Sequence, residues 1–140
     1  MPTELSIHAV HRGGMRVLVA GGGHEVLTDY PLPGGEPAAG LTSLQLLLGS
    51  LASCSANGLR ALLQRDGVQL DRLEVTASGQ RRETHPTVLE SIHLAFDLAG
   101  PGLDPEAIER TLRIAETRVC PVWVMVAAGT PITRSVTLRG

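Results

Sequence analysis

The sequence contains few aromatic residues and no excess of basic charge. With one Phe, one Tyr and one Trp, it offers no set of aromatic side chains on which bases could stack. Its formal net charge of −2 provides no basic surface for nucleic acid or for an anionic membrane. We therefore expect neither nucleic acid nor a membrane as a partner.

We also expect neither a targeting segment nor a membrane-spanning segment. The N-terminal residues MPTELSIHAVHR do not combine a charged start with an apolar block, as a signal peptide would. Polar residues such as Gln45, Ser50 and Asn57 interrupt the most apolar stretch, so it holds no uncharged apolar run of about 18 residues. We expect a soluble, cytoplasmic protein whose 140 residues form a single domain, residues 1–140.

Cysteine and histidine lack the spacing of a metal site. The two cysteines, Cys54 and Cys120, form no C-x-x-C motif, which excludes thioredoxin-like and zinc-ribbon sites. His8 and His11 would point to opposite faces of a strand, which argues against a shared metal. The glycines at 21–23 lack the context of a phosphate-binding loop and predict a hairpin turn instead. We expect no metal and no cofactor.

The most apolar stretch predicts a long helix over Thr42–Arg65. Thr42 and Gln45 have the spacing of a capping box at its start, and Gly67 suits the positive φ that follows a helix. At about 100° per residue, one narrow apolar stripe contains Leu47, Leu51, Cys54 and Gly58. Cys54 is therefore expected on a buried face of this helix.

Alternating apolar and polar residues predict strands on both sides of the helix. The expected strands are Leu5–Ala9, Met15–Val19 and His24–Asp29 before it, and Leu73–Ala77, Ile92–Leu98 and Ile132–Leu138 after it. The first two strands after the helix, Leu73–Ala77 and Ile92–Leu98, should form an antiparallel hairpin. This order of elements indicates an α+β fold.

A second helix is expected to begin after Asp104, its N-cap, with Pro105 at the first position. Pro121 should end it at Cys120, and a short helix over 122–128 should follow. The expected buried stripe of the helix that begins after Asp104 comprises Ile108, Leu112, Ala115 and Val119.

The two thiols are the strongest candidates for chemistry. Cys54 lies too deep in its helix to gain from the N-terminal dipole, so it is either an inert core residue or a nucleophile that needs a cation from elsewhere in the fold. Cys120, at the expected N-cap of the short helix, lies where free N–H groups favour a thiolate. A pairing of the two is physically reasonable, but their spacing does not prove it.

The residues around both cysteines resemble the OsmC/Ohr family. The block LQLLLGSLASCSANGLRALLQRDGVQLDRLEV is similar to the family's first Cys motif, and ETRVCPV is similar to its second. The intervening GQRRETHPTVLESIHLAFDLAG resembles the family's second half, closest to its less-characterised OsmC-like branch. The likeness covers nearly the whole chain.

This resemblance implies antiparallel sheets around a long central helix, an intertwined homodimer, and a thiol peroxidase that acts on organic hydroperoxides. Cys54 would be oxidised to a sulfenic acid, and Cys120 would resolve it as a disulfide. A dithiol reductant would then reopen the bridge. The family also places an arginine from the N-terminal strands beside the thiol, for which Arg16 is the better match and Arg12 the reserve.

One position departs from the family pattern. Characterised members carry Pro-Glu ten residues before the first Cys, and the Glu holds the arginine, whereas this chain has Ser43-Leu44. Leu44 cannot accept a hydrogen bond, so another group must hold the arginine, with Glu36 a weak candidate. The departure favours an alternative function, a non-catalytic dimer that binds a small lipophilic ligand or senses oxidation.

Overall fold

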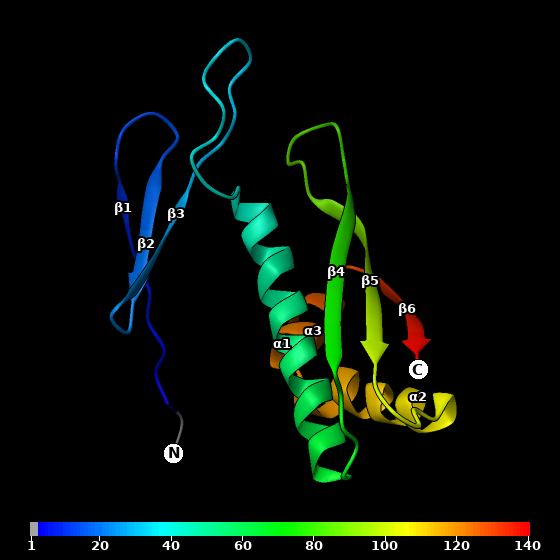
Figure 1. The fold of residues 1–140 in the computed structure, drawn as a ribbon. Helices are drawn as coiled ribbons and strands as arrows, with labels where there is room; N and C mark the ends of the chain where they lie inside the picture. The colour runs from blue at the N-terminus through cyan, green and yellow to red at the C-terminus, as the bar shows by residue number, and fades with distance from the viewer. Residues whose placement is uncertain (1–2) are drawn as a thin grey trace. The chain divides into compact units, whose positions relative to one another are not determined.

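A computed structural model describes residues 3–140 of the chain. By its internal contacts the chain divides into two compact units, Met1–Leu47 and Leu48–Gly140. The long helix α1, Ser43–Arg65, begins in the first unit and continues in the second (Figure 1). The expectation of a single domain over residues 1–140 stays a prediction.

The N-terminal unit is built around a three-stranded antiparallel sheet with the order β1-β2-β3. Its strands are β1 (His8–His11), β2 (Val17–Gly21) and β3 (His24–Thr28). Gly22 and Gly23 both have positive φ, of 59° and 81°, which is the geometry of a two-residue type I′ hairpin turn. The hairpin turn expected at this glycine run is therefore confirmed.

The first strand is shorter than the alternation of Leu5, Ile7 and Ala9 indicated. In the β1–β2 register His8 opposes Ala20, so Ile7 would oppose Gly21 and any earlier residue would face the turn. Residues 3–6 consequently have no residue of β2 to pair with, and the Leu5 and Ile7 side chains are 91% and 68% exposed.

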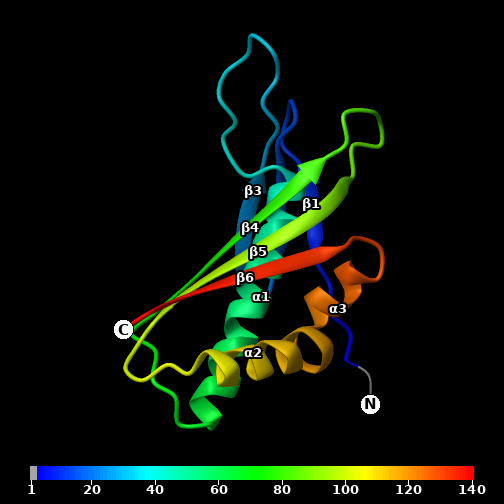
Figure 2. The same cartoon turned by 90° about the vertical axis from the view of Figure 1, so that its right-hand side faces the viewer.

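The C-terminal unit contains a second three-stranded sheet with the order β4-β5-β6 (Figure 2). The strands are β4 (Arg72–Arg81), β5 (Leu89–Ala99) and β6 (Ile132–Arg139). The expected antiparallel hairpin of β4 and β5 is confirmed, but β6 runs parallel to β5. All-antiparallel pairing was the wrong expectation here, because the connection from β5 to β6 is a crossover that contains helices.

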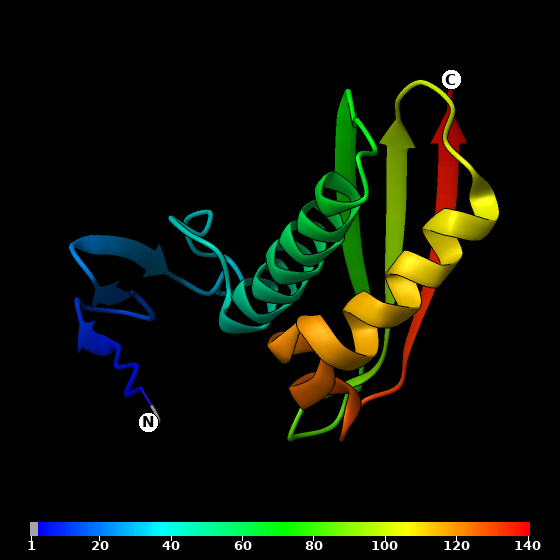
Figure 3. The same ribbon diagram turned by 90° about the horizontal axis from the view of Figure 1, so that it is seen from below.

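Helices α1 and α2 lie on one face of this sheet, as Figure 3 shows. Alternate β5 side chains, from Ile92 to Leu98, are buried on the covered face as expected, together with Leu51, Leu59 and Leu63 of α1. By length and composition α1 could also cross a membrane, a test that core helices of soluble proteins pass as well. Its buried leucines show it acting as a core helix in this unit.

The crossover contains α2 (Pro105–Ile114), the π-helical turn η1 (Ala115–Val119) and α3 (Pro121–Ala127). Asp104 is the N-cap of α2, where its carboxylate accepts a hydrogen bond from the Glu106 N–H at 3.2 Å. Ile108, Leu112 and Ala115 are buried as expected, but Val119 is 40% exposed. The wider π turn is the reason, because it rotates the following residues away from the α-helical stripe.

Candidate functional site

Cys54 lies on α1 at the edge of the buried face and not at its centre. The capping box that starts this helix is present, with Thr42 and Gln45 exchanging hydrogen bonds of 2.9 and 3.2 Å. Among the helix residues facing the core, Leu51 and Ser55 are buried, whereas Cys54 is half-buried and Leu47 is 40% exposed. Cys54 is thus more accessible to solvent than its place on the apolar stripe predicted.

Cys120 lies at the N-cap of α3 and is 1% exposed. Both cysteines are free thiols, and the Cys54 side chain lies close enough to the Cys120 thiol to change the pKa of that thiol. The fold therefore brings together two sulfurs that the sequence separates by an entire hairpin and helix. Their contact is the main chemical feature of the C-terminal unit.

Burial, and after it the adjacent Cys54, raise the pKa of the Cys120 thiol to about 11. The backbone N–H groups of Trp123 and Val122 lower this pKa, but they do not offset the loss of solvation. Cys120 lies at the start of a helix as predicted, but the prediction that this position makes it a thiolate is wrong. Cys120 is a protonated thiol at neutral pH.

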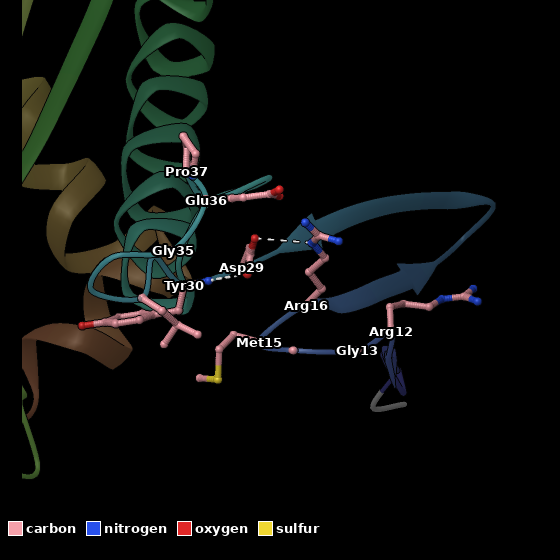
Figure 4. Close-up of a pocket in the computed structure, with 11 residues that line it drawn as sticks. Arg12, Gly13, Met15, Arg16, Asp29, Tyr30, Gly35, Glu36 and Pro37 are labelled. Carbon is pink, nitrogen blue, oxygen red and sulfur yellow. Dashed lines mark hydrogen bonds and ion pairs between the residues drawn. The ribbon is translucent and has the colours of Figure 1, made fainter.

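Arg16 and Asp29 form an ion pair at one end of the N-terminal sheet (Figure 4). The Nε atom of Arg16 lies 3.6 Å from Oδ2 of Asp29, whose side chain is 9% exposed. The Asp29 carboxylate also accepts hydrogen bonds of 2.8 Å from the N–H groups of Tyr30 and Ala39. The Ala39 and Tyr30 N–H groups, with the charge of Arg16, lower the pKa of Asp29, so it is ionised at neutral pH.

A cavity of about 450 Å³ adjoins this ion pair within the N-terminal unit (Figure 4). Its lining includes both candidate arginines, Arg12 and Arg16, and also Met15, Tyr30 and Glu36. Arg16 belongs to the N-terminal unit and the cysteine pair to the C-terminal unit. The placement of Arg16 or Arg12 at the thiol therefore stays a prediction.

Asp29 is the polar residue that the sequence analysis did not identify. The signal was present in the hairpin turn, because a two-residue turn at Gly22–Gly23 places Val17 opposite Thr28 and hence Arg16 opposite Asp29.

In the region that the structure describes, residues 3–140, no group of three or more His, Cys, Asp or Glu side chains could hold a metal ion.

Comparisons with known proteins agree with this architecture. The model of the OsmC-like protein family matches residues 34–135. Protein YhfA of Escherichia coli strain K12 is 26% identical over 113 residues, which cover 81% of each chain.

Two solved structures show the fold. An OsmC-like protein from Mycoplasma pneumoniae is 19% identical and superimposes with a TM-score of 0.87 over 100% of both chains. The organic hydroperoxide resistance protein OhrB of Bacillus subtilis is 17% identical and superimposes with a TM-score of 0.65 over 95% of this chain and 98% of its own. Since the family match extends over most of the sequence and includes both cysteines, the chain belongs to the OsmC-like protein family.

Proposed function

We propose that this protein is a thiol-dependent peroxidase that reduces organic hydroperoxides with Cys54 and Cys120. Membership of the OsmC-like family supports a redox or peroxide-stress role. Among similar structures, that from Bacillus subtilis is an organic hydroperoxide resistance protein. The observation that carries the proposal is the contact between a half-buried Cys54 and a buried, protonated Cys120.

This arrangement favours different roles for the two sulfurs. The more accessible Cys54, as a thiolate, attacks the terminal oxygen of the hydroperoxide. The O–O bond breaks, the alkoxide takes a proton from water and leaves as an alcohol, and Cys54 becomes a sulfenic acid. Cys120 then loses its proton and attacks the Cys54 sulfur, so that water leaves and a disulfide forms. An external dithiol reduces this disulfide by exchange and is itself oxidised.

The Arg16 guanidinium is the cation that we propose for the Cys54 thiolate. A positive group near a half-buried sulfur stabilises the thiolate over the thiol and the negative charge that develops on the peroxide oxygen. We place the reaction in the cytoplasm, where dithiol reductants keep both cysteines reduced.

We also propose that the protein works as a homodimer. The N-terminal sheet carries exposed apolar side chains and has no core of its own, since Thr28 is its one buried strand residue. A small sheet with exposed apolar side chains is unstable in water unless another surface covers it. The exposed apolar residues of this unit include Leu5, Ile7, Val10, Val26 and Leu32. A second copy of the chain is the proposed cover, and sedimentation of the purified protein tests it.

The peroxidase proposal is tested by counting thiols. Treatment of the reduced protein with tert-butyl hydroperoxide should remove both thiols per chain and leave an intramolecular disulfide, which mass spectrometry detects. Cys54→Ser should abolish turnover with dithiothreitol, and Cys120→Ser should leave a sulfenic acid that dimedone traps. Full peroxidase activity in Cys54→Ser would exclude the mechanism.

The second candidate is a non-catalytic protein that senses oxidation or binds a lipophilic ligand. The apolar Leu44, at the position where the family carries an acidic residue, favours this candidate. A sensor would consume about one equivalent of peroxide per chain and stop, whereas a peroxidase would consume peroxide for as long as dithiothreitol is present.

A further inference from the structure

We infer that Asp29 is a positioning residue for Arg16, and that its fixed carboxylate holds the guanidinium at this end of the N-terminal sheet. The inference rests on the proposed function, in which Arg16 serves the Cys54 thiolate. It adds to that function a residue that neither the sequence motifs nor the family comparison identify.

The sheet places the two residues opposite each other. Arg16 directly precedes β2 and Asp29 directly follows β3, and the register pairs the adjacent Val17 with Thr28. The Thr28 hydroxyl donates a hydrogen bond to the Val17 carbonyl at 3.1 Å, which closes this end of the ladder. The Arg16–Asp29 contact is therefore a cross-strand pair set by the backbone and not a chance meeting of two flexible side chains.

The Asp29 carboxylate is itself held in place. The Tyr30 N–H binds Oδ1 and the Ala39 N–H binds Oδ2, both at 2.8 Å. The Asp29 N–H donates to the Leu41 carbonyl at 3.0 Å, so Asp29 ties the loop 30–40 to the end of the sheet. A carboxylate with two such bonds cannot follow a moving arginine. It acts as a fixed anchor to which the guanidinium must come.

The contact is an ion pair between the Arg16 guanidinium and the Asp29 carboxylate. Nε of Arg16 lies 3.6 Å from Oδ2 of Asp29, an ion-pair distance at which the fixed carboxylate restricts where the guanidinium can lie. Glu36 lines the same cavity, but within residues 3–140 the ion pair of Arg16 is with Asp29. An arginine without this contact would sample many rotamers, and ordering it during the reaction would slow the chemical step.

The test is a double-mutant cycle on peroxide-driven oxidation of Cys54, measured in a single turnover with the Cys120→Ser background to isolate the first step. Asp29→Asn should slow the reaction by about 10- to 100-fold and move the midpoint of its pH–rate profile to higher pH, since the thiolate would lose its aligned cation. Arg16→Ala should slow it at least as much. In the Arg16→Ala background Asp29→Asn should have no further effect, because Asp29 acts through Arg16.

Three results would overturn the inference: a wild-type rate in Asp29→Asn, a wild-type rate in Arg16→Ala, or an equal loss from Asp29→Asn with and without Arg16. If Asp29→Asn does not fold, Arg16→Lys asks the same question and leaves the loop anchor intact. An ammonium group on a flexible stem lacks the planar fork of the guanidinium, so Asp29 would not hold it in the same orientation, and this variant should be at least 10-fold slower. A wild-type rate in Arg16→Lys would likewise contradict the inference.

Failure of the proposed function has a different signature. In that case, in the protein that carries Cys120→Ser and no other substitution, tert-butyl hydroperoxide would leave Cys54 reduced at every pH. Rapid oxidation of that protein together with no effect of Asp29→Asn would instead reject the role of Asp29 alone.

Discussion

Cys120 donates its backbone N–H to the carbonyl oxygen of Ala115, five residues earlier, at 2.8 Å. This hydrogen bond closes the π turn η1, which has one residue more than an α-helical turn. The extra residue moves Val119 to the surface and turns Cys120 into the core beside Cys54. The π turn is thus the local feature that brings the second thiol to the first.

Removal of one residue from this turn should separate the two thiols. Deletion of Thr117 would restore an α-helical turn and move Cys120 to the exposed place that Val119 now occupies. Oxidation should then give no intramolecular disulfide, which mass spectrometry of the peroxide-treated protein reports. Thr117→Ala is the matched control, since it keeps the length of the turn and loses only the side-chain bond to the Arg113 carbonyl. A disulfide formed at the wild-type rate in the deletion variant would contradict this role of the turn.

Alkaline pH should destabilise the reduced protein through Cys120. The pKa of this thiol rises from an ordinary value of 9.0 to about 11 in the folded protein. The unfolded chain therefore loses the proton first, so the free energy of unfolding is fully retained below pH 9 and falls between pH 9 and 11. We expect a loss of about 1–3 kcal/mol, measured by urea unfolding at fixed protein concentration.

The composition makes this titration simple to assign. The chain has no lysine, which removes the commonest side chain that ionises in this pH range. In Cys120→Ala, the free energy of unfolding at alkaline pH should stay close to the value that this variant has at pH 8. An unchanged alkaline slope in Cys120→Ala would assign the effect to another group.

Arg134 should contribute measurably to stability. On β6 it is 14% exposed and makes 2.8 Å hydrogen bonds to Glu109 of α2 and Glu116 of η1. Arg134→Ala would leave both carboxylates without this partner, at a cost of about 1–3 kcal/mol in the free energy of unfolding. Arg113→Ala, which removes an exposed 3.5 Å contact to Glu109, should cost less than about 0.5 kcal/mol.

The same ion pair predicts a loss of stability in acid. The hydrogen bond from Arg134 lowers the pKa of Glu109, so the stabilisation is present above the ordinary pKa of 4.5 and is lost as the pH falls below it. Arg134→Ala should show a shallower acid loss than the wild-type protein. Equal acid slopes in the two proteins would contradict the assignment.

Two glycines of the C-terminal unit should respond to alanine in opposite directions. A Cβ at Gly49, inside α1, would meet nothing within 4 Å, so Gly49→Ala should stabilise the protein by up to about 1 kcal/mol. A Cβ at Gly100 would lie 2.5 Å from the Gln69 carbonyl oxygen, and Gly100→Ala should cost about 1–3 kcal/mol. Thermal unfolding of the two variants, side by side, checks both signs.

Local patterns predicted most elements because their signals lie within a few residues. The Thr42–Gln45 capping box, the Asp104 N-cap and the glycine turn before β3 all act over one turn of chain. Such local hydrogen bonds set where a helix or hairpin begins, whatever the rest of the fold does. The order of elements and the α+β class followed from them.

The face of α1 that is buried could not be predicted in the same way. Helical periodicity placed Leu47 and Cys54 on the central stripe, but the buried face is rotated toward Ser55 and Leu59. The direction of β6 and the position of Cys120 depend likewise on a crossover and on a π turn that no periodic pattern marks. These features arise from packing between distant segments.

The sequence by itself determined the helices, the turns and the two Cys motifs that identify the family. Tertiary structure decided that Cys54 is half-buried, that Cys120 lies beside it as a protonated thiol, and that Asp29 is the partner of Arg16. The physical reason is that the reactivity of a thiol and the orientation of a guanidinium depend on solvation and on charges. Those are supplied by residues far away in the chain.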